Sequence, residues 1–256
     1  RVILGGKFMS EWNAVLYDNK HDFVAEYGKG LLEFIPENKN QSILDLGCGT
    51  GILTAQLKNL AEKIIGIDSS NSMIKKAKEQ YNDINFMVCD ALALPFENQF
   101  DIVFSNAVFH WITDHNALLS NVRKALKPNG TLVCEFGANG NIATIENAFA
   151  KVCQNLGYKY NTKFNFPTSE HFSDLLKKNG FIIDKIYDYD RPTILKDNKQ
   201  GLTNWIKQFF ASYLELIPEK TQYEIIKKVE NLTRNTLWND NEWIADYRRL
   251  RAIAHI

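Results

Sequence analysis

Residues 43–51 read Ile43-Leu44-Asp45-Leu46-Gly47-Cys48-Gly49-Thr50-Gly51, an apolar run that leads into three glycines at alternate positions. A helical pattern begins directly after this run, near Thr50. Glycine permits a positive φ and lets a ligand approach the backbone closely. Amides at the start of a helix attract an anionic group such as a carboxylate. The stretch therefore predicts a strand, a turn and a helix around a ligand site; the alternative is a tight turn without a ligand.

The spacing of the glycines distinguishes two kinds of ligand. Dinucleotide-binding folds use G-x-G-x-x-G, in which a pyrophosphate lies on the helix end, whereas position 52 here is Ile. Asp45, just before the glycines, adds an acceptor suited to a cationic amino group. Amides and a carboxylate together suit the zwitterionic methionine group of S-adenosyl-L-methionine better than a pyrophosphate.

Apolar runs and helical patterns alternate along the first half of the chain. The runs are continuous, as in parallel strands covered on both faces: Ser42–Leu46, Lys63–Asp68, Ile84–Val88, Phe100–Asn106 and Thr131–Phe136. Helices are expected between them, at Ile52–Leu60, Ser70–Tyr81 and His115–Leu126, and Lys127-Pro128-Asn129-Gly130 forms a turn. Repeated units of this kind predict a doubly wound sheet.

The second half of the chain is patterned more loosely. It predicts helices at Ile142–Leu156 and Ser169–Asn179, strands at Phe181–Tyr187 and Tyr247–Ile256, and an aromatic-rich helical stretch at Leu202–Leu237. We expect one α/β domain over 1–256, built on a Rossmann-like, mostly parallel seven-stranded sheet. Residues 201–238 form a helical lid insertion between its last two strands.

Composition excludes several classes of protein. Thirty basic and thirty acidic side chains balance, so no overall field favours nucleic acid or an anionic membrane. The densest basic clusters, Lys227-Lys228 and Arg248-Arg249-x-Arg251, are expected to be solvated. Cysteines 48, 89, 134 and 153 form no C-x-x-C pair, which argues against a zinc site or disulfides and favours a cytoplasmic protein. No membrane span or signal peptide is expected, and Met9 is the expected natural start.

Acidic residues follow the second and third strands. Asp68, about 20 residues after the glycine turn, is placed to accept hydrogen bonds from ribose hydroxyls. Ser69 and Met73 follow it; Met73 packs either on an adenine face or in the core. Asp90 and the Ala91 amide suit an adenine edge, although Asp90 is also a candidate helix N-cap.

The fourth strand leads through Asn106 and Ala107 into Val108-Phe109-His110-Trp111. A hydrogen-bonding side chain after an apolar strand lies near the ligand edge of such a sheet. His110 therefore either faces a substrate or is a satisfied structural histidine.

These motifs together resemble the class I methyltransferases. The resemblance rests on the glycine turn, Asp68, Asp90-Ala91, Phe100-Asp101-Ile102-Val103 and Leu126-Lys127-Pro128-Asn129-Gly130, and covers about Tyr17 to Phe136. Segments Ser105–Trp111 and Trp243–His255 further resemble the trans-aconitate methyltransferase-like group, within methyltransferase type 11. The resemblance implies S-adenosyl-L-methionine as cofactor and S-adenosyl-L-homocysteine as product.

The resemblance also implies a set of cofactor-binding residues. Asp45, Gly47 and Gly49 would contact the methionine portion, Asp68 the ribose, and Asp90-Ala91 the adenine. The full set is Tyr17, His21, Asp45, Gly47, Cys48, Gly49, Asp68, Ser69, Met73, Asp90, Ala91, Asn106 and Phe109. An N-terminal helical cover over 9–35, with Trp12 and Phe23, would fold over the cofactor. Asn129 replaces the usual glycine but tolerates a left-handed conformation.

The expected reaction is methyl transfer to a carboxylate or hydroxyl oxygen of a small molecule. A hydroxyl acceptor needs a base, for which His110 and His21 are the candidates. A carboxylate acceptor instead needs a cation, for which Arg191 and Arg248 are the candidates unless they form surface or lid salt bridges. The substrate pocket is expected to contain His110, Trp111, Arg191 and Arg248, without a metal. The protein is expected to be a monomer or homodimer.

Two alternatives remain from the sequence. The chain could be a non-catalytic module that retains the cofactor pocket. It could also be an NAD-dependent oxidoreductase, which Ile52 in the glycine motif disfavours.

Overall fold

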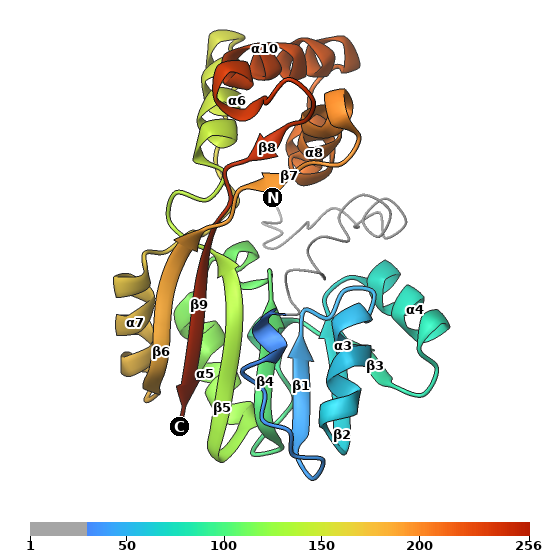
Figure 1. The fold of residues 1–256 in the computed structure, drawn as a ribbon, viewed down its shortest axis with the longest axis vertical. Coiled ribbons are helices and arrows are strands. Elements are labelled where there is room, and N and C mark those ends of the chain that lie inside the picture. The colour runs from blue at the N-terminus through green and yellow to red at the C-terminus, as the bar shows by residue number, and fades with distance from the viewer. Residues whose placement is uncertain (1–29) are drawn as a thin grey trace, which may run out of the picture. The chain divides into compact units, whose positions relative to one another are not determined.

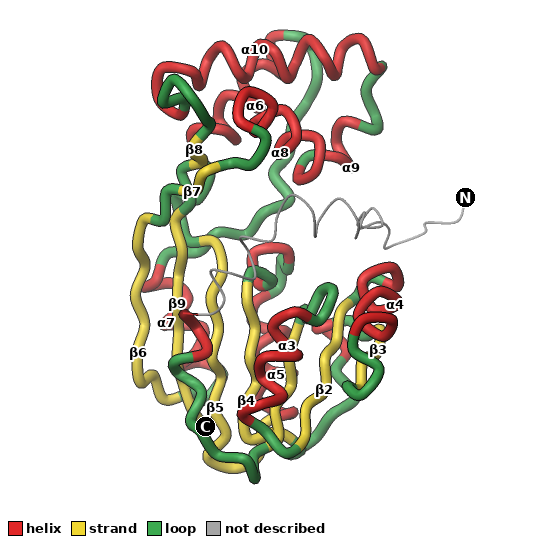
Figure 2. The backbone as a smooth tube through the Cα atoms, turned by 45° about the vertical axis from the view of Figure 1, so that its right-hand side comes forward, coloured by secondary structure: helices red, strands yellow, loops and turns green. Residues whose placement is uncertain are grey.

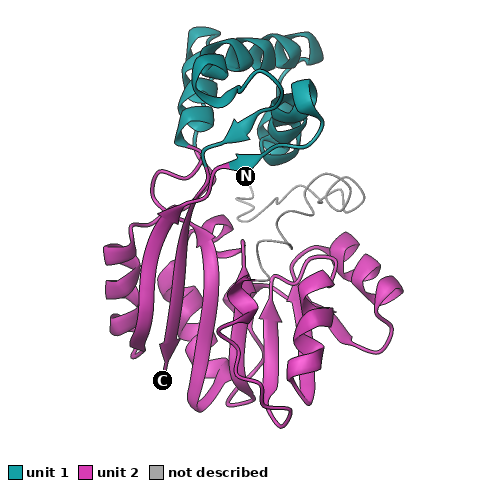
Figure 3. Cartoon of the chain, viewed as in Figure 1, with its two compact units in different colours: residues 1–13, 143–161, 193–246 teal, residues 14–142, 162–192, 247–256 magenta. Residues whose placement is uncertain are grey.

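The computed structural model describes residues 30–256, which divide into two compact units (Figure 3). The sheet unit comprises 30–142, 162–192 and 247–256, and the helical unit comprises 143–161 and 193–246. The predicted N-terminal cover over 9–35 therefore lies largely outside the described residues, as do Tyr17 and His21.

The sheet unit contains seven strands in the order β3-β2-β1-β4-β5-β9-β6 (Figure 1). Their bounds are β1 Ser42–Leu46, β2 Lys63–Asp68, β3 Asn85–Val88, β4 Phe100–Asn106, β5 Leu126–Gly137, β6 Ile182–Asp190 and β9 Arg248–His255. Strand β9 runs antiparallel to both of its neighbours, and the strands from β3 to β5 are parallel. The predicted seven-stranded, mostly parallel sheet is confirmed.

Two hydrophobic layers cover the faces of the sheet. Alternate residues of a strand point to opposite faces, so Ile43 packs with helices α3 (Ile52–Leu57) and α4 (Asn71–Gln80). Leu44 packs on the other face, with α5 (His115–Ala125) and α7 (Ser169–Lys178). Because both faces are covered, the strands are apolar throughout, which is why they were recognisable in the sequence.

Short helical turns link these elements. A 3-10 turn, η1 (Lys58–Leu60), extends α3, and two more, η2 (Ala91–Ala93) and η3 (Phe109–Trp111), follow β3 and β4. The predicted turn at 127–130 lies within the first part of β5, and Asn129 adopts φ 65°. The expectation that Asn129 takes a left-handed conformation is confirmed.

Helices dominate the helical unit (Figure 2). It contains α6 Ala143–Asn155, β7 Thr193–Ile194, η4 Asn198–Gln200, α8 Gly201–Phe209, α9 Ala211–Leu214, α10 Glu219–Leu237 and β8 Ile244–Ala245. The predicted single stretch Leu202–Leu237 is interrupted before α10 by Pro218, which has no N–H for a helical hydrogen bond. The unit is also wider than the predicted insertion 201–238, because α10 packs against α6.

The aromatic residues of this unit form its own core. Trp205 and Phe210 are buried, and the ring of Phe149 stacks on Phe210 with centroids 4.3 Å apart. This packing explains why the segment is rich in aromatic residues. A role as a lid stays a prediction.

Candidate active site

The three glycines after β1 differ in what surrounds them. All have positive φ: 78° at Gly47, 55° at Gly49 and 86° at Gly51. A Cβ added at Gly47 would lie 2.1 Å from the Val108 side chain, and one at Gly51 would lie 2.7 Å from Phe86. No described residue lies within 4 Å of a Cβ added at Gly49. Gly49 therefore marks the side of the turn that a ligand can approach.

The carboxylate of Asp68 joins the end of β2 to this turn. Its Oδ2 accepts a hydrogen bond from the Gly49 amide at 3.0 Å, and its Oδ1 accepts one from the Ser70 amide at 2.8 Å. Burial raises the pKa of Asp68, and these backbone bonds oppose the shift. The predicted ribose acceptor therefore lies beside the approachable face of the turn.

Asp45 lies under the turn, only 2% exposed, and accepts a hydrogen bond from the Thr54 hydroxyl at 2.6 Å. Burial raises the pKa of Asp45 to about 7, while the Thr54 bond lowers it and the Asp68 charge raises it further. Burial and the two nearby carboxylates also raise the pKa of the Cys48 thiol, so this thiol stays neutral. Sequence analysis missed Thr54, which no motif marks.

The ends of β3 and β4 carry the next predicted residues. Asp90 caps η2 by accepting a hydrogen bond from the Leu92 amide at 2.9 Å, which confirms the N-cap interpretation. Asn106 ends β4, and Ala107 after it adopts φ 61°. A left-handed alanine costs about 1–2 kcal/mol, and such strained residues occur most often at functional sites.

Two predicted cofactor residues are buried in the protein itself. Phe109 is 0% exposed, and its ring packs against Phe136 and Phe172 with centroids 5.3 and 6.2 Å away. Its side chain belongs to the core cluster, so any contact with a ligand must come from its backbone. Met73 is also buried, at 4% exposed, in agreement with the core interpretation.

His110 is a buried histidine whose Nδ1 accepts a hydrogen bond from the Gly137 amide at 3.2 Å. Burial holds the pKa of His110 well below its usual range, and the Arg249 charge lowers it further. The ring is therefore neutral, and the hydrogen bond at Nδ1 assigns the proton to Nε2. In this state Nε2 is a donor and cannot accept a proton from a hydroxyl acceptor.

An aromatic cluster surrounds His110. The Trp111 ring lies 4.9 Å from Phe164, the Phe164 ring stacks on Phe166 at 5.2 Å, and the Phe166 ring lies 5.7 Å from His110, between centroids. The Asn165 amide fixes this segment by donating to the His110 carbonyl at 2.9 Å. Sequence analysis missed Phe164 and Phe166 because they lie outside any periodic pattern.

The two arginines predicted for the acceptor pocket both have carboxylate partners. Arg191 donates from both terminal nitrogens to the Glu135 carboxylate, at 2.5 and 3.2 Å. Arg248 pairs with Asp190 at 2.6 Å and with Asp188. The salt-bridge interpretation of these residues holds in this structure, and acceptor binding by them stays a prediction.

The prediction that Arg248-Arg249-x-Arg251 is a solvated cluster is wrong for two of its members. Arg249 and Arg251 are only 6% and 8% exposed, because β9 lies between β5 and β6 and alternate residues share one covered face. Arg251 donates from Nε to the buried Glu135 at 2.7 Å. The prediction from sequence rested on the charges of these residues, and the position of β9 between β5 and β6 was not apparent from them.

Comparison with known proteins decides the family. The family model described as a methyltransferase domain matches residues 44–134. The uncharacterized methyltransferase C70.08c of Schizosaccharomyces pombe is 30% identical over 267 residues, which cover 95% of this chain and 97% of that protein. The chain belongs to the class I S-adenosylmethionine-dependent methyltransferases. The same matches do not favour the oxidoreductase or the non-catalytic alternative.

Further methyltransferases are similar to this chain in sequence or in fold. Trans-aconitate 2-methyltransferase of Deinococcus radiodurans is 35% identical over 131 residues, half of each chain. A solved structure of phosphoethanolamine N-methyltransferase 2 from Haemonchus contortus matches with a TM-score of 0.59 at 21% identity. The match covers 96% of this chain and 57% of that one, and it shows a shared fold.

The methyltransferase uses S-adenosylmethionine as its cofactor. The donor set at the turn fits this molecule: Asp45 and Asp68 supply carboxylates, and the Gly49 backbone leaves space for a ligand. Within residues 30–256, no helix is both long and apolar enough to cross a membrane.

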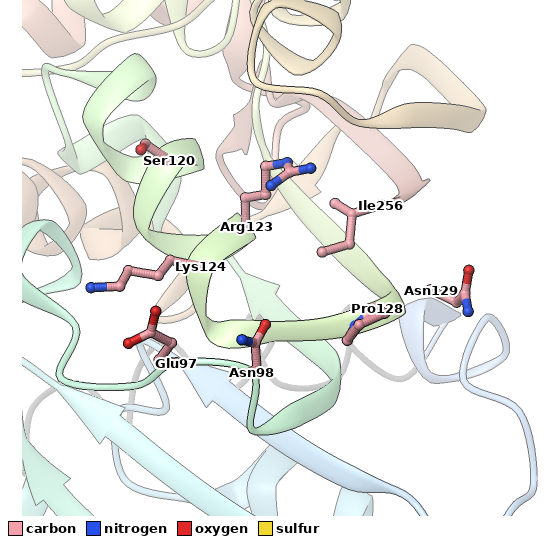
Figure 4. A pocket seen from close by; sticks show the side chains of 8 residues that line it. All are labelled: Glu97, Asn98, Ser120, Arg123, Lys124, Pro128, Asn129 and Ile256. Carbon is pink, nitrogen blue, oxygen red and sulfur yellow. The ribbon is translucent and has the colours of Figure 1, made fainter.

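A pocket at the other edge of the sheet is unrelated to this site (Figure 4). Its lining combines the loop before β4, the end of α5 and the first part of β5: Glu97, Asn98, Ser120, Arg123, Lys124, Pro128, Asn129 and Ile256. Ligands of such sheets bind at the carboxyl ends of the parallel strands, where the glycine turn and Asn106 lie. We assign no role to this pocket.

Proposed function

We propose that this methyltransferase transfers a methyl group to an oxygen atom of a small molecule, and that the oxygen belongs to a carboxylate. The main support for a carboxylate acceptor is the protonation state of the His110 ring. Its Nδ1 accepts a hydrogen bond from the Gly137 amide and its pKa is depressed, so Nε2 carries the proton and can donate a hydrogen bond to an acceptor molecule. A carboxylate is already ionised and needs no base, whereas a hydroxyl acceptor requires one. The name of the Deinococcus radiodurans relative, whose acceptor is a carboxylic acid, supports the same choice.

The proposed cofactor contacts follow the strand ends. Asp45 would bind the amino group of the methionine portion, Asp68 the ribose hydroxyls, and Asp90 with the Ala91 amide the adenine. Gly49 would allow close approach to the backbone. When bound, the cofactor supplies an electrophilic methyl group on a sulfonium. The predicted cofactor contacts of Tyr17 and His21 remain part of this proposal, and both residues lie outside the described part of the chain.

The proposed acceptor site uses the aromatic cluster. Trp111, Phe164 and Phe166 would exclude water and hold the acceptor, while His110 Nε2 would donate a hydrogen bond to it. Correct alignment of two reactants supplies about 7–11 kcal/mol of a reaction barrier. The chain would therefore catalyse the transfer mainly by orientation, without a base.

A turnover screen tests the proposal. The full chain is incubated with methyl-labelled cofactor and matched sets of carboxylic acids, phenols and amines. We expect label in carboxylic acids, and a His110→Gln variant, which retains a donor, that keeps more activity than His110→Phe. Turnover of phenols or amines alone would overturn the choice of acceptor.

A further inference from the structure

Arg249 carries a buried guanidinium that has no carboxylate partner among residues 30–256. It is 6% exposed and lies near the start of β9, between Gly137 at the end of β5 and Tyr189 of β6. Within residues 30–256, no carboxylate lies within 4.0 Å of its guanidinium, and the guanidinium donates no hydrogen bond. Its guanidinium carbon lies 4.7 Å from the centroid of the Tyr247 ring. Buried charges are normally paired, so an unpaired guanidinium at this position is energetically costly.

The carboxylate that attracts Arg249 is already shared by other groups. Glu135 accepts hydrogen bonds from Arg191, from Arg251 and from the Tyr189 hydroxyl, the last at 2.8 Å. Two guanidinium groups, those of Arg191 and Arg251, therefore contact this carboxylate, and the Arg249 charge interacts with it from further away. Three positive charges and one negative charge leave the cluster with an excess of positive charge. Burial lowers the pKa of Arg249, and Arg191 lowers it further while Glu135 opposes them. An arginine nevertheless remains charged at neutral pH.

Arg249 lies in register with the part of the sheet that carries the proposed acceptor site. Its partner on β5 is Gly137, whose amide donates to His110. A Cβ on Gly137 would lie 2.4 Å from the Phe166 ring, so the glycine gives Phe166 room beside His110. The Arg249 charge also lowers the pKa of His110.

We propose that Arg249 binds a carboxylate group of the methyl acceptor. This inference rests on the proposed function, because it names the group that orients a carboxylic acid at that site. The guanidinium fork matches a carboxylate with two parallel hydrogen bonds, and the anion neutralises the excess charge of the cluster. A bidentate pair occupies both oxygens of the carboxylate, so the methylated oxygen belongs to another group of the acceptor.

The first test measures stability without ligands. A residue kept for a ligand destabilises the empty protein, whereas a structural residue stabilises it. We expect Arg249→Met, which preserves much of the side-chain volume, to raise the unfolding temperature by a few degrees. The matched variant Arg191→Met should lower it, because it removes a partner of the buried Glu135. A fall in the unfolding temperature of Arg249→Met as large as that of Arg191→Met would overturn the proposal.

The second test measures ligand-induced shifts of the unfolding temperature. Trans-aconitate and succinate are added to the wild-type chain and to Arg249→Met, with and without S-adenosylhomocysteine; dimethyl succinate and phosphate are the controls. We expect at least one carboxylate to stabilise the wild type and not Arg249→Met, with Arg249→Lys intermediate. Equal shifts in both proteins, no carboxylate shift in the wild type, or a shift with phosphate alone would overturn the proposal. S-adenosylhomocysteine should stabilise both proteins, and its failure with the wild type would count against the proposed function instead.

Discussion

The Gly49 amide donates a hydrogen bond to the Asp68 carboxylate at 3.0 Å, so the turn after β1 and the end of β2 form one connected site. Gly49 lies on the face of the turn that a ligand can approach, and Asp68 lies beside it. The bond holds Asp68, the proposed acceptor for ribose hydroxyls, beside the amides of the turn. The geometry around this pair of residues and the proposed acceptor site leads to five predictions.

Replacing Asp68 with alanine should weaken cofactor binding and also destabilise the fold. The change removes the ribose acceptor, which should weaken the affinity for S-adenosylhomocysteine by about 1–3 kcal/mol. It also leaves the Gly49 and Ser70 amides without their acceptor. Calorimetric titration and thermal unfolding measure the two effects. The control is Asp83→Ala, an exposed carboxylate paired with Lys58, which should leave the affinity unchanged. Unchanged affinity in folded Asp68→Ala would contradict the assignment.

The pKa of Asp45, raised by burial to about 7, predicts how cofactor affinity depends on pH. An ionised Asp45 attracts the amino group of the cofactor, so affinity should rise with pH through about 7. The ionised fraction grows from about one tenth at pH 6 to about nine tenths at pH 8, so affinity should rise about tenfold. Calorimetry at the two pH values measures this rise, which Asp45→Asn should abolish. An equal rise in Asp45→Asn would assign the dependence to another group.

The same raised pKa predicts the opposite trend for the stability of the empty protein. The folded chain holds the Asp45 proton more strongly than the unfolded chain, whose pKa is near 3.8. The contribution of Asp45 is therefore fully present below about pH 4 and is lost as pH rises through about 7. Comparing unfolding free energies of the wild type and Asp45→Asn across this range isolates the effect. A contribution that grows with pH would contradict the raised pKa.

Comparing alanine substitutions at Gly49 and Gly157 distinguishes an effect on ligand binding from an effect of backbone strain. Gly49 and Gly157 both have positive φ, 55° and 80°, and no described residue lies within 4 Å of a Cβ added to either. Alanine at each position should cost about 1–2 kcal/mol of stability. Only Gly49→Ala should also weaken S-adenosylhomocysteine binding, measured by calorimetry. If both variants bind equally well, the approachable side of the turn is not the cofactor site.

Trp111 should matter more for the acceptor than for the cofactor. Its ring packs on Phe164, in the aromatic cluster beside His110. Trp111→Ala should lower methyl transfer at least tenfold while changing S-adenosylhomocysteine affinity less than twofold, and Phe164→Ala should behave in the same way. Tyr223→Ala, which changes an exposed ring of the helical unit, is the control. Equal loss of both properties, or of neither, would show that Trp111 does not line a separate acceptor site.

Much of the fold could be predicted because each strand and helix is marked by a pattern within its own short stretch of sequence. The parallel strands are buried on both faces, so each is a continuous apolar run, as at Lys63–Asp68. Asp68 and Asn106 were found for the same reason, since a polar residue that directly follows such a run lies at a strand end. Interruptions of the long helical stretch were missed, although Pro218 marks one of them.

The buried arginines and the aromatic cluster around His110 depend on contacts between distant segments. Arg249 and Arg251 appear in the sequence as part of a charged cluster, and only the position of β9 between two strands buries them. Phe166 reaches His110 because Gly137, more than twenty residues before it, has no side chain. No short stretch of the sequence contains both partners of these contacts.

The chemical form of the transferred methyl group tests most directly whether this methyltransferase acts on a carboxylate. The wild-type chain is incubated with methyl-labelled S-adenosylmethionine and a panel of di- and tricarboxylic acids that includes trans-aconitate, and the labelled product is treated with mild alkali. We expect transfer to at least one acid, with the label released as methanol because the product is a methyl ester. Cofactor binding without transfer to any carboxylic acid, or label that resists alkali on a nitrogen or carbon atom, would contradict a carboxylate acceptor.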